Sequence, residues 1–333
     1  MIQRLAFALV LLAGCSAAIP FAKAPHSLGT SGAPVTAGRT LPPNLLYTLG
    51  GKPQSRAPYI QVFDAQAAGP TPSPLYTIRP EGNTGFGLLA VDAQNDLFAE
   101  KFFYNGDGKL YQFPPGSTVP STTCLLHPHA GTLALRNGKL YLSREGASIA
   151  EYAEPLPKGN VCPKPLRTLV DERAKRFGNG ILGLVADPQG DVFDVWSSPS
   201  TYTGSIDEFS SGSTHAHLFA NLGKSSGTFY LVSDRNGDLL TSIDGYKGSF
   251  NDSIAVFPHG SGVPKLFYPS GPGEYGGVGL ASHEREFFAL NSYPVATVHI
   301  YEYDPKTATL GAEERRSFSN VWGPGQSIAV FSK

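Results

Sequence analysis

Apolar residues recur along this chain in short alternating runs, which are typical of β-strands with a buried face. One pattern occurs six times: an aliphatic residue, two further residues, and then Phe or Tyr. The copies are at 60–63, 110–113, 149–152, 206–209, 254–257 and 300–303. Five steps from residue 60 to residue 300 give a mean spacing of 48 residues, which indicates a structural repeat.

A second pattern precedes most copies of the first. It consists of an apolar strand ending near an aspartate, a polar turn, and another apolar run. The clearest examples end at Asp92, Asp187 and Asp234, and weaker ones lie at 133–141 and 279–289. Asn-Gly and Gly-Asp pairs between apolar runs tolerate positive φ and favour hairpin turns. Each repeat is therefore predicted to be an antiparallel meander of about four strands.

A four-stranded meander cannot bury both of its faces alone, so its copies must pack on one another. Units of this length arranged radially are the blades of a β-propeller. Six units of 48 residues need 288 residues, and residues 44–333 number 290. The sequence therefore predicts an all-β, six-bladed β-propeller with four antiparallel strands per blade.

The two ends of the repeat region are out of phase with the blades. The region begins with segments that read as second and third strands, at 45–49 and 59–63. It ends with a single segment that reads as a first strand, at 327–331. We expect this C-terminal strand to complete the N-terminal blade and close the ring without an unpaired edge.

Residues 1–15 have the pattern of an export signal. Arg4 precedes an apolar run at 5–12, which is too short to span a bilayer. The segment Leu12-Ala13-Gly14-Cys15 resembles the lipobox of bacterial lipoproteins. That resemblance implies lipidation at Cys15 and anchoring to the bacterial cell envelope, on a periplasmic or extracellular face. An ordinary secretory leader cleaved after residues 16–18 would instead release the protein without an anchor.

Residues 16–43 are rich in Ala, Pro, Gly, Ser and Thr and show no apolar periodicity. Such a composition predicts a flexible tether, with an average span of roughly 30 Å. The propeller domain is accordingly expected at 44–333, held away from a membrane by this segment.

Cys124 and Cys162 remain once Cys15 is assigned to the anchor. In an oxidising exported compartment an isolated pair favours a disulfide over a metal site. Closing this loop would stabilise the fold by up to roughly 4 kcal/mol on chain-entropy grounds. The alternative is two buried thiols that do not meet.

Composition narrows the functional classes. The chain has 26 Lys and Arg against 27 Asp and Glu, and only 16% of its residues are charged. This balance excludes a polycationic nucleic-acid binder. With 38 Gly, 28 Pro and one Met, turn formers outnumber strong helix formers, as expected for a protein of short strands.

The repeated order of apolar strand, Asp-x-x-Gly-Asp, apolar strand and aliphatic-x-x-aromatic resembles the NHL-repeat propellers. It resembles the senescence-marker and gluconolactonase-type propellers more remotely. The resemblance covers roughly residues 44–333, but its motif specifies turns and core packing. It therefore implies the fold and leaves the chemistry open.

The remote resemblance implies one specific candidate site. Gluconolactonase-type enzymes hold a divalent cation in the channel mouth with Glu, Asn and Asp, and Glu81 and Asn179 lie in plausible loops. Oxygen ligands would suit Ca²⁺. The late loop at 276–278 offers no matching Asp, and Glu81 and Asn179 have the alternative role of satisfying turn backbone.

In propellers, the loops that enter each first strand and those that join the second and third strands share one face. That face surrounds the channel mouth, a default ligand site. Several of these loops are aromatic and would suit sugars, peptides or flat ligands. The residues expected on this ligand-binding face are Glu81, Asn83, His129, Asn179, Trp196, Tyr246, Glu274, Tyr275, Tyr293 and Trp322.

Three other motifs are better explained by structure than by chemistry. The pairs His127/His129 and His215/His217 have a spacing that could bind a transition metal, but no Cys or carboxylate accompanies them at a diagnostic spacing. Residues 223–227 match Gly-x-Ser-x-Gly, but no strand-to-helix turn is expected there. Asp92, Asp187 and Asp234 recur with the repeat, so turn capping explains them.

The sequence favours a non-catalytic binding or scaffold module for a protein or small ligand. The alternatives are a metal-dependent lactonase or other hydrolase at the channel mouth, and a lyase or quinone-dependent oxidoreductase. Catalysis needs convergent charged groups in the channel. Glu81, Asn179, Glu274 and His283 would have to point inward for an enzyme.

Overall fold

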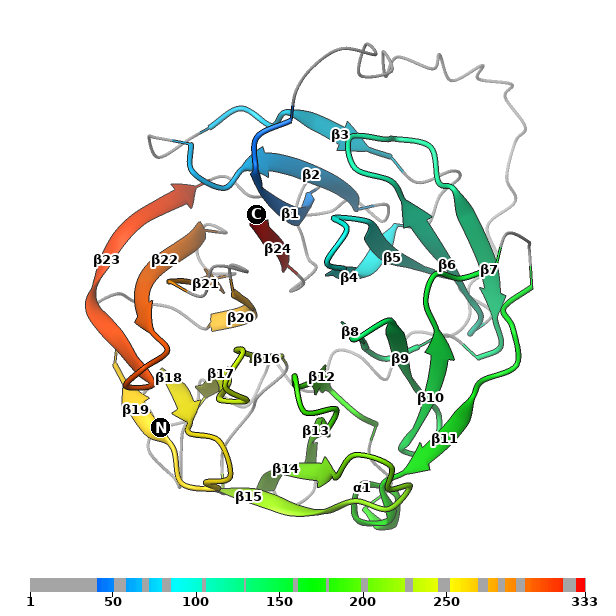
Figure 1. Ribbon diagram of the computed structural model, residues 1–333, viewed down its shortest axis with the longest axis vertical. Coiled ribbons are helices and arrows are strands. Elements are labelled where there is room, and N and C mark those ends of the chain that lie inside the picture. The colour runs from blue at the N-terminus through cyan, green and yellow to red at the C-terminus, as the bar shows by residue number, and fades with distance from the viewer. Residues whose placement is uncertain are drawn as a thin grey trace, which may run out of the picture. The chain divides into compact units, whose positions relative to one another are not determined.

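Every strand in the described part of the chain belongs to one of six four-stranded antiparallel sheets. We describe the protein from a computed structural model. The described residues are 41–50, 58–67, 72–79, 85–103, 106–128, 130–157, 161–177, 180–198, 203–224, 230–244, 252–268, 275–280, 285–291, 297–319 and 328–332. The sheets surround a central axis as blades (Figure 1), so the six-bladed β-propeller predicted from the repeat is confirmed.

Blade 1 joins the two ends of the repeat region. Its strands, from the centre outward, are β24 (Ile328–Ser332), β1 (Asn44–Gly50), β2 (Tyr59–Asp64) and β3 (Tyr76–Ile78). β24 pairs antiparallel with β1, with Val330 opposite Leu46. The predicted closure by the C-terminal strand is therefore confirmed.

Blades 2 to 6 follow in chain order, each running from an inner first strand to an outer fourth strand. Blade 2 contains β4 (Phe86–Val91), β5 (Leu97–Phe102), β6 (Gly108–Phe113) and β7 (Thr122–Leu126). Blade 3 contains β8 (Leu133–Arg136), β9 (Lys139–Arg144), β10 (Ser148–Ala153) and β11 (Arg167–Val170). Blade 4 contains β12 (Gly183–Ala186), β13 (Val192–Ser198), β14 (Thr203–Phe209) and β15 (His217–Lys224).

The last two blades have the same plan. Blade 5 contains β16 (Leu231–Ser233), β17 (Leu239–Asp244), β18 (Asp252–Phe257) and β19 (Lys265–Phe267). Blade 6 contains β20 (Tyr275–Leu280), β21 (Glu286–Asn291), β22 (Thr297–Asp304) and β23 (Thr309–Ser319). A short helix, α1 (Glu172–Arg176), lies between β11 and β12, where the chain passes from blade 3 to blade 4.

The aliphatic-x-x-aromatic motif lies on the third strand of every blade, and all twelve of its apolar side chains are buried. Two residues separated by three positions point to opposite faces of a strand. In blade 4, Ile206 therefore packs against blade 5, whereas Phe209 packs against blade 3. The same division holds in the other blades and produces six hydrophobic clusters, one at each interface between blades.

The repeated aspartates cap the turns between first and second strands. The Oδ1 atoms of Asp92, Asp187 and Asp234 accept the backbone N–H four residues later, at 2.7, 2.9 and 2.9 Å. Asn95, Gly190 and Gly237 in these turns have positive φ. The turn-capping interpretation of the recurrent aspartates is confirmed.

Two further contacts tie the blades to neighbouring segments. A disulfide links Cys124 on β7 to Cys162, in the connection between the third and fourth strands of blade 3. Leu41 packs against the cluster between blades 1 and 2, so packing extends into the last residues of the segment predicted as a tether. Residues 1–40 lie outside the described part of the chain.

We predict that removing residues 328–333 destabilises the whole ring. The deletion exposes one edge of β1 and removes the buried side chains of Ile328 and Val330, a loss of at least about 3 kcal/mol. For a domain of this size the melting temperature should fall by about 6–12 °C, measured by circular dichroism. Removal of Lys333 alone is the control. A melting temperature within 2 °C of the intact chain would contradict a closing role for β24.

Candidate functional site

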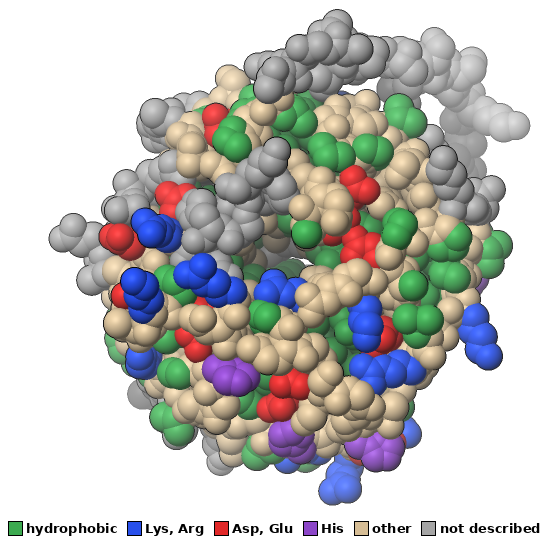
Figure 2. Space-filling view, viewed as in Figure 1, with side chains coloured by type: hydrophobic (Ala, Val, Ile, Leu, Met, Phe, Trp, Pro, Cys, Tyr) green, Lys and Arg blue, Asp and Glu red, His purple; other side chains and the backbone are tan. Residues whose placement is uncertain are grey.

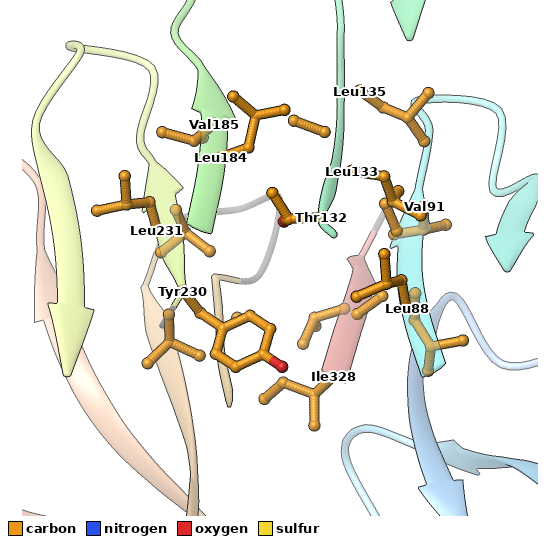
Figure 3. Close-up of a pocket in the computed structure, with 18 of the residues that line it drawn as sticks. Leu88, Val91, Thr132, Leu133, Leu135, Leu184, Val185, Tyr230, Leu231 and Ile328 are labelled. Atoms are coloured by element: carbon orange, nitrogen blue, oxygen red, sulfur yellow. The ribbon is translucent and has the colours of Figure 1, made fainter. Parts of the chain in front are cut away.

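The first strands of the six blades surround the centre of the ring (Figure 1). They enclose a cavity of about 160 Å³, which we call the channel (Figure 3). Figure 2 shows a hollow near the centre of the face in view, with acidic and basic side chains both spread around it. The cavity is lined by residues 88–91, 132–135, 184–185, 230–232, 278–280 and 328–330.

The channel wall is almost entirely aliphatic. Thr132 and Tyr230 are the only residues with polar side chains among its described lining residues. The phenol ring of Tyr230 points into the opening, toward the side that carries Leu88 and Ile328 (Figure 3). Burial raises the pKa of Tyr230 to about 12, so its hydroxyl is neutral at physiological pH. The wall therefore provides apolar contact and two neutral hydroxyls, those of Thr132 and Tyr230.

The apolar lining follows from how the blades pack. An inner strand presents alternate side chains to its two neighbouring interfaces. On β12, Leu184 belongs to the cluster between blades 3 and 4, and Val185 packs against the cluster between blades 4 and 5. Both also line the channel. The same aliphatic residues thus form the core and the channel wall.

Most residues predicted on the ligand-binding face lie outside the described part of the chain. They are Glu81, Asn83, His129, Asn179, Tyr246, Glu274, Tyr293 and Trp322, and His283 lies outside it too. The backbone of Tyr275 begins β20, but its side chain is not among those described. The calcium position suggested for Glu81 and Asn179 therefore remains a prediction.

Trp196 differs from its predicted place on an exposed aromatic rim. β13 continues through Ser198, so Trp196 is a strand residue whose side chain points into the interface between blades 3 and 4. Its exposed fraction is 3%, and Phe177 stacks on it with ring centroids 5.1 Å apart. The indole N–H donates to Oδ2 of Asp207 at 3.0 Å. Trp196 is therefore part of a blade interface, and the prediction that it lies on the rim of the ligand-binding face is wrong.

Asp207, which accepts from Trp196, belongs to a set of carboxylates that the sequence pattern did not predict. Asp171, Asp194 and Asp207 are all buried, and one oxygen of each lies within 4.8 Å of the others. A charged residue at the centre of an apolar strand was the available signal, since Asp194 alternates with Val192 and Trp196. Asp171 comes from a different blade connection, which strand pattern alone does not predict.

Among the described residues, the histidines of the two motifs do not come together around a common point where a metal could bind. Nδ1 of His127 lies 2.7 Å from Asp107, and Nε2 of His217 lies 3.5 Å from Glu208. His215 contacts the hydroxyl of Thr214. In the Gly-x-Ser-x-Gly segment, residues 223–224 end β15, and residues 225–227 are outside the described part.

Comparisons with known proteins show the fold alone. No protein-family model and no curated protein matches this chain. A solved protein from Lactobacillus plantarum is 12% identical, with 87% of this chain and 99% of that chain covered and a TM-score of 0.57. A protein of unknown function from Bacteroides caccae is 11% identical over 86% and 98%, with a TM-score of 0.56. A "putative 6-phosphogluconolactonase" from Bacteroides uniformis is 12% identical over 84% of each chain, with a TM-score of 0.53.

Proposed function

We propose that this chain is an exported, lipid-anchored β-propeller that acts as a binding module at its channel mouth. The ligand inserts a small apolar group into the channel and contacts the surrounding loops with the rest of its surface. The aliphatic channel wall is the observation that carries this proposal. Such a wall stabilises an uncharged group by removing apolar surface from water.

The size of the cavity limits what can enter it. An engineered apolar cavity of about 150 Å³ in another protein binds benzene or xenon. The channel here, at about 160 Å³ and lined mainly by Leu, Val, Ile and Ala, has a similar volume and a largely similar chemistry. Pockets that enclose whole drug-sized ligands measure about 300–1,000 Å³. One ring or one branched alkyl group therefore fits, as part of a larger molecule or of a partner protein.

The proposed location of the protein rests on its N-terminal sequence. The lipobox-like segment ending at Cys15 supports lipid anchoring, and the composition of residues 16–43 supports a flexible tether. No helix among the described residues is long and apolar enough to cross a membrane.

A metal-dependent lactonase is the second candidate. One structural neighbour is named as a putative 6-phosphogluconolactonase. In this protein the activity would depend on Glu81 and Asn179 holding Ca²⁺ at the channel mouth. The two candidates differ in the chemistry they require at the mouth, so they can be separated by experiment.

We predict that toluene and indole, used as probes of the channel, stabilise the protein. A probe at ten times its dissociation constant should raise the free energy of unfolding by about 1.4 kcal/mol. The melting temperature should then rise by about 3–5 °C in thermal-shift measurements. Val185→Trp fills the channel and should remove this response. Val119→Trp, at a residue that is 69% exposed and away from the cavity lining, is the matched control and should keep it. An equal response from all three proteins would show that the probes bind elsewhere.

We predict no hydrolysis above the buffer rate when the protein is assayed on sugar lactones and phosphoesters with added calcium. A wall of aliphatic groups and one neutral phenol provides no ionised acid or base from the described lining residues. Calcium-dependent turnover that disappears in Glu81→Gln and Asn179→Ala, but not in Gln66→Ala at an exposed position between β2 and β3, would establish the lactonase instead.

We predict that Cys15 carries the anchor. In a Gram-negative host grown with an alkyne-labelled fatty acid, the full-length chain should take up the label and sediment with membranes. Cys15→Ser should lose both properties, because the acyl acceptor is absent. Cys124→Ser controls for the loss of a cysteine and should stay labelled. Labelling that survives in Cys15→Ser would contradict the lipobox interpretation.

A further inference from the structure

A fully buried group of carboxylates lies in the interface between blades 3 and 4, away from the residues that line the channel. Asp171, Asp194 and Asp207 have exposed fractions of 0%. Each offers an oxygen within 4.8 Å of the other two. The same interface also contains the buried side chains of Val192 and Trp196.

The fold places these three side chains together. Asp194 and Asp207 are direct partners in the register between β13 and β14, on the face that packs against blade 3. Asp171 is the N-cap of α1 and reaches the interface from the connection after β11. Like charges directly opposite each other in a sheet destabilise it. The arrangement therefore requires something that compensates the charge.

Hydrogen bonds satisfy only part of this group. Asp207 accepts from the indole of Trp196 at 3.0 Å and pairs with Nε of Arg173 at 3.1 Å. Oδ1 of Asp171 accepts the backbone N–H groups of Arg173 and Ala174 at 2.8 and 3.1 Å. Among the residues that the structure describes, Oδ2 of Asp171 and both oxygens of Asp194 have no hydrogen-bond partner. Three buried oxygens of the group thus lack a described donor.

The charge of the group is also incompletely balanced. Among the described residues, the three carboxyl groups have one ion pair, between the guanidinium of Arg173 and Asp207. Burial, and then the neighbouring Asp171 and Asp207, raise the pKa of Asp194 well above its usual range. Burial, and then Asp207, raise the pKa of Asp171 to about 6. Three buried oxygens without a described donor, beside the single ion pair with Arg173, therefore favour a bound positive species at this position, either a proton or a cation.

Another carboxylate in the same interface shows how this protein neutralises a buried acid with its own side chains. Glu151 is 2% exposed, and its two oxygens pair with Nζ of Lys139 at 2.9 Å and Nε of Arg167 at 2.6 Å. Both of its oxygens therefore have a cationic partner. Asp194 is equally buried and has none among the described contacts. A structural ion pair, such as that of Glu151, satisfies both oxygens with side chains of the protein. A ligand site needs oxygens that are left for the ligand, as those of Asp194 are among the described contacts.

We propose that Asp171, Asp194 and Asp207 form a binding site for one divalent cation that prefers oxygen ligands. Carboxylate-only sites suit Ca²⁺, Mg²⁺ or Mn²⁺ and do not suit metals that prefer thiolate or imidazole. Three carboxylates offer up to six oxygens, of which Oδ2 of Asp171 and both oxygens of Asp194 are free to coordinate. The side chain of Arg173 is 43% exposed and pairs with Asp207, so the group has a contact with a side chain that reaches the surface.

The cation would join two separate parts of the ring. Asp171 belongs to the connection from blade 3, whereas Asp194 and Asp207 belong to blade 4. Their common ligand would fix α1 against β13 and β14. The chain continues from α1 into residues 178–180, one of the loops predicted to surround the channel mouth.

Thermal unfolding of the full chain, purified in mild detergent, tests the site. After EDTA treatment and dialysis, CaCl₂, MgCl₂ and MnCl₂ are added separately. A cation at 100 times its dissociation constant should raise the melting temperature by about 5–10 °C. Equilibrium dialysis followed by elemental analysis should find one bound ion per chain for the cation that gives the largest shift.

Matched variants locate the response. Asp194→Asn keeps the shape of the side chain and removes its charge, so it should abolish the cation shift while leaving the EDTA-treated protein at least as stable as the parent. Glu100→Gln alters another buried carboxylate, in the interface between blades 2 and 3, and should keep the shift. Asp171→Asn is the second test of the site if Asp194→Asn does not fold, and it should also lose the shift.

Two results would overturn the proposal. A cation shift that is lost in Glu81→Gln but retained in Asp194→Asn would place the ion at the channel mouth and support the lactonase candidate. The absence of any cation shift, with a stability that rises as the pH falls toward 5 and loses that dependence in Asp194→Asn, would mean that the carboxylates share a proton. Because the folded-state pKa values are raised, protonation would then stabilise the native state at low pH.

Discussion

Each blade has two apolar faces, and the packing of those faces against both neighbours is the constraint on which the rest of the structure depends. A four-stranded sheet with one uncovered face would leave a whole cluster such as Leu46, Phe63 and Ile300 in water. A ring solves this only if it closes, which is why β24 crosses from the end of the chain to β1. The aliphatic channel is a consequence of the same packing, because the inner strands complete the six clusters.

The sequence predicts the ring because its signals repeat. The pair Ile206 and Phe209, three positions apart, must face opposite neighbours, and six copies of that spacing define six blades with two-sided packing. The aspartates that precede the second strands of blades 2, 4 and 5 predict those turns for an equally local reason. Closure could also be predicted, since the two ends of the repeat region are complementary fragments of one blade.

The functional features could be predicted less well because they depend on exceptions to the repeat. Trp196 lies two residues inside the end of β13, and a shift of that size decides between a rim residue and a buried one. The group around Asp194 needs the register between β13 and β14 and a contribution from the preceding blade connection. The burial of Trp196 and the grouping of the carboxylates both depend on tertiary structure, and no short sequence pattern predicts them. The channel mouth depends on loop residues such as Glu81 and Asn179, whose types alone do not settle their role.

The most direct measurement of the central claim is native-state hydrogen exchange of the backbone amides, followed by mass spectrometry of peptides from β24, β1 and β13. If all blade faces are held by a closed ring, β24 and β1 open only together with the interior strands. The account predicts that these three strands share one exchange free energy, close to that of global unfolding. Fast exchange of β24 beside a protected β1 and β13 would show that the ring is stable without its closing strand, and would contradict the account.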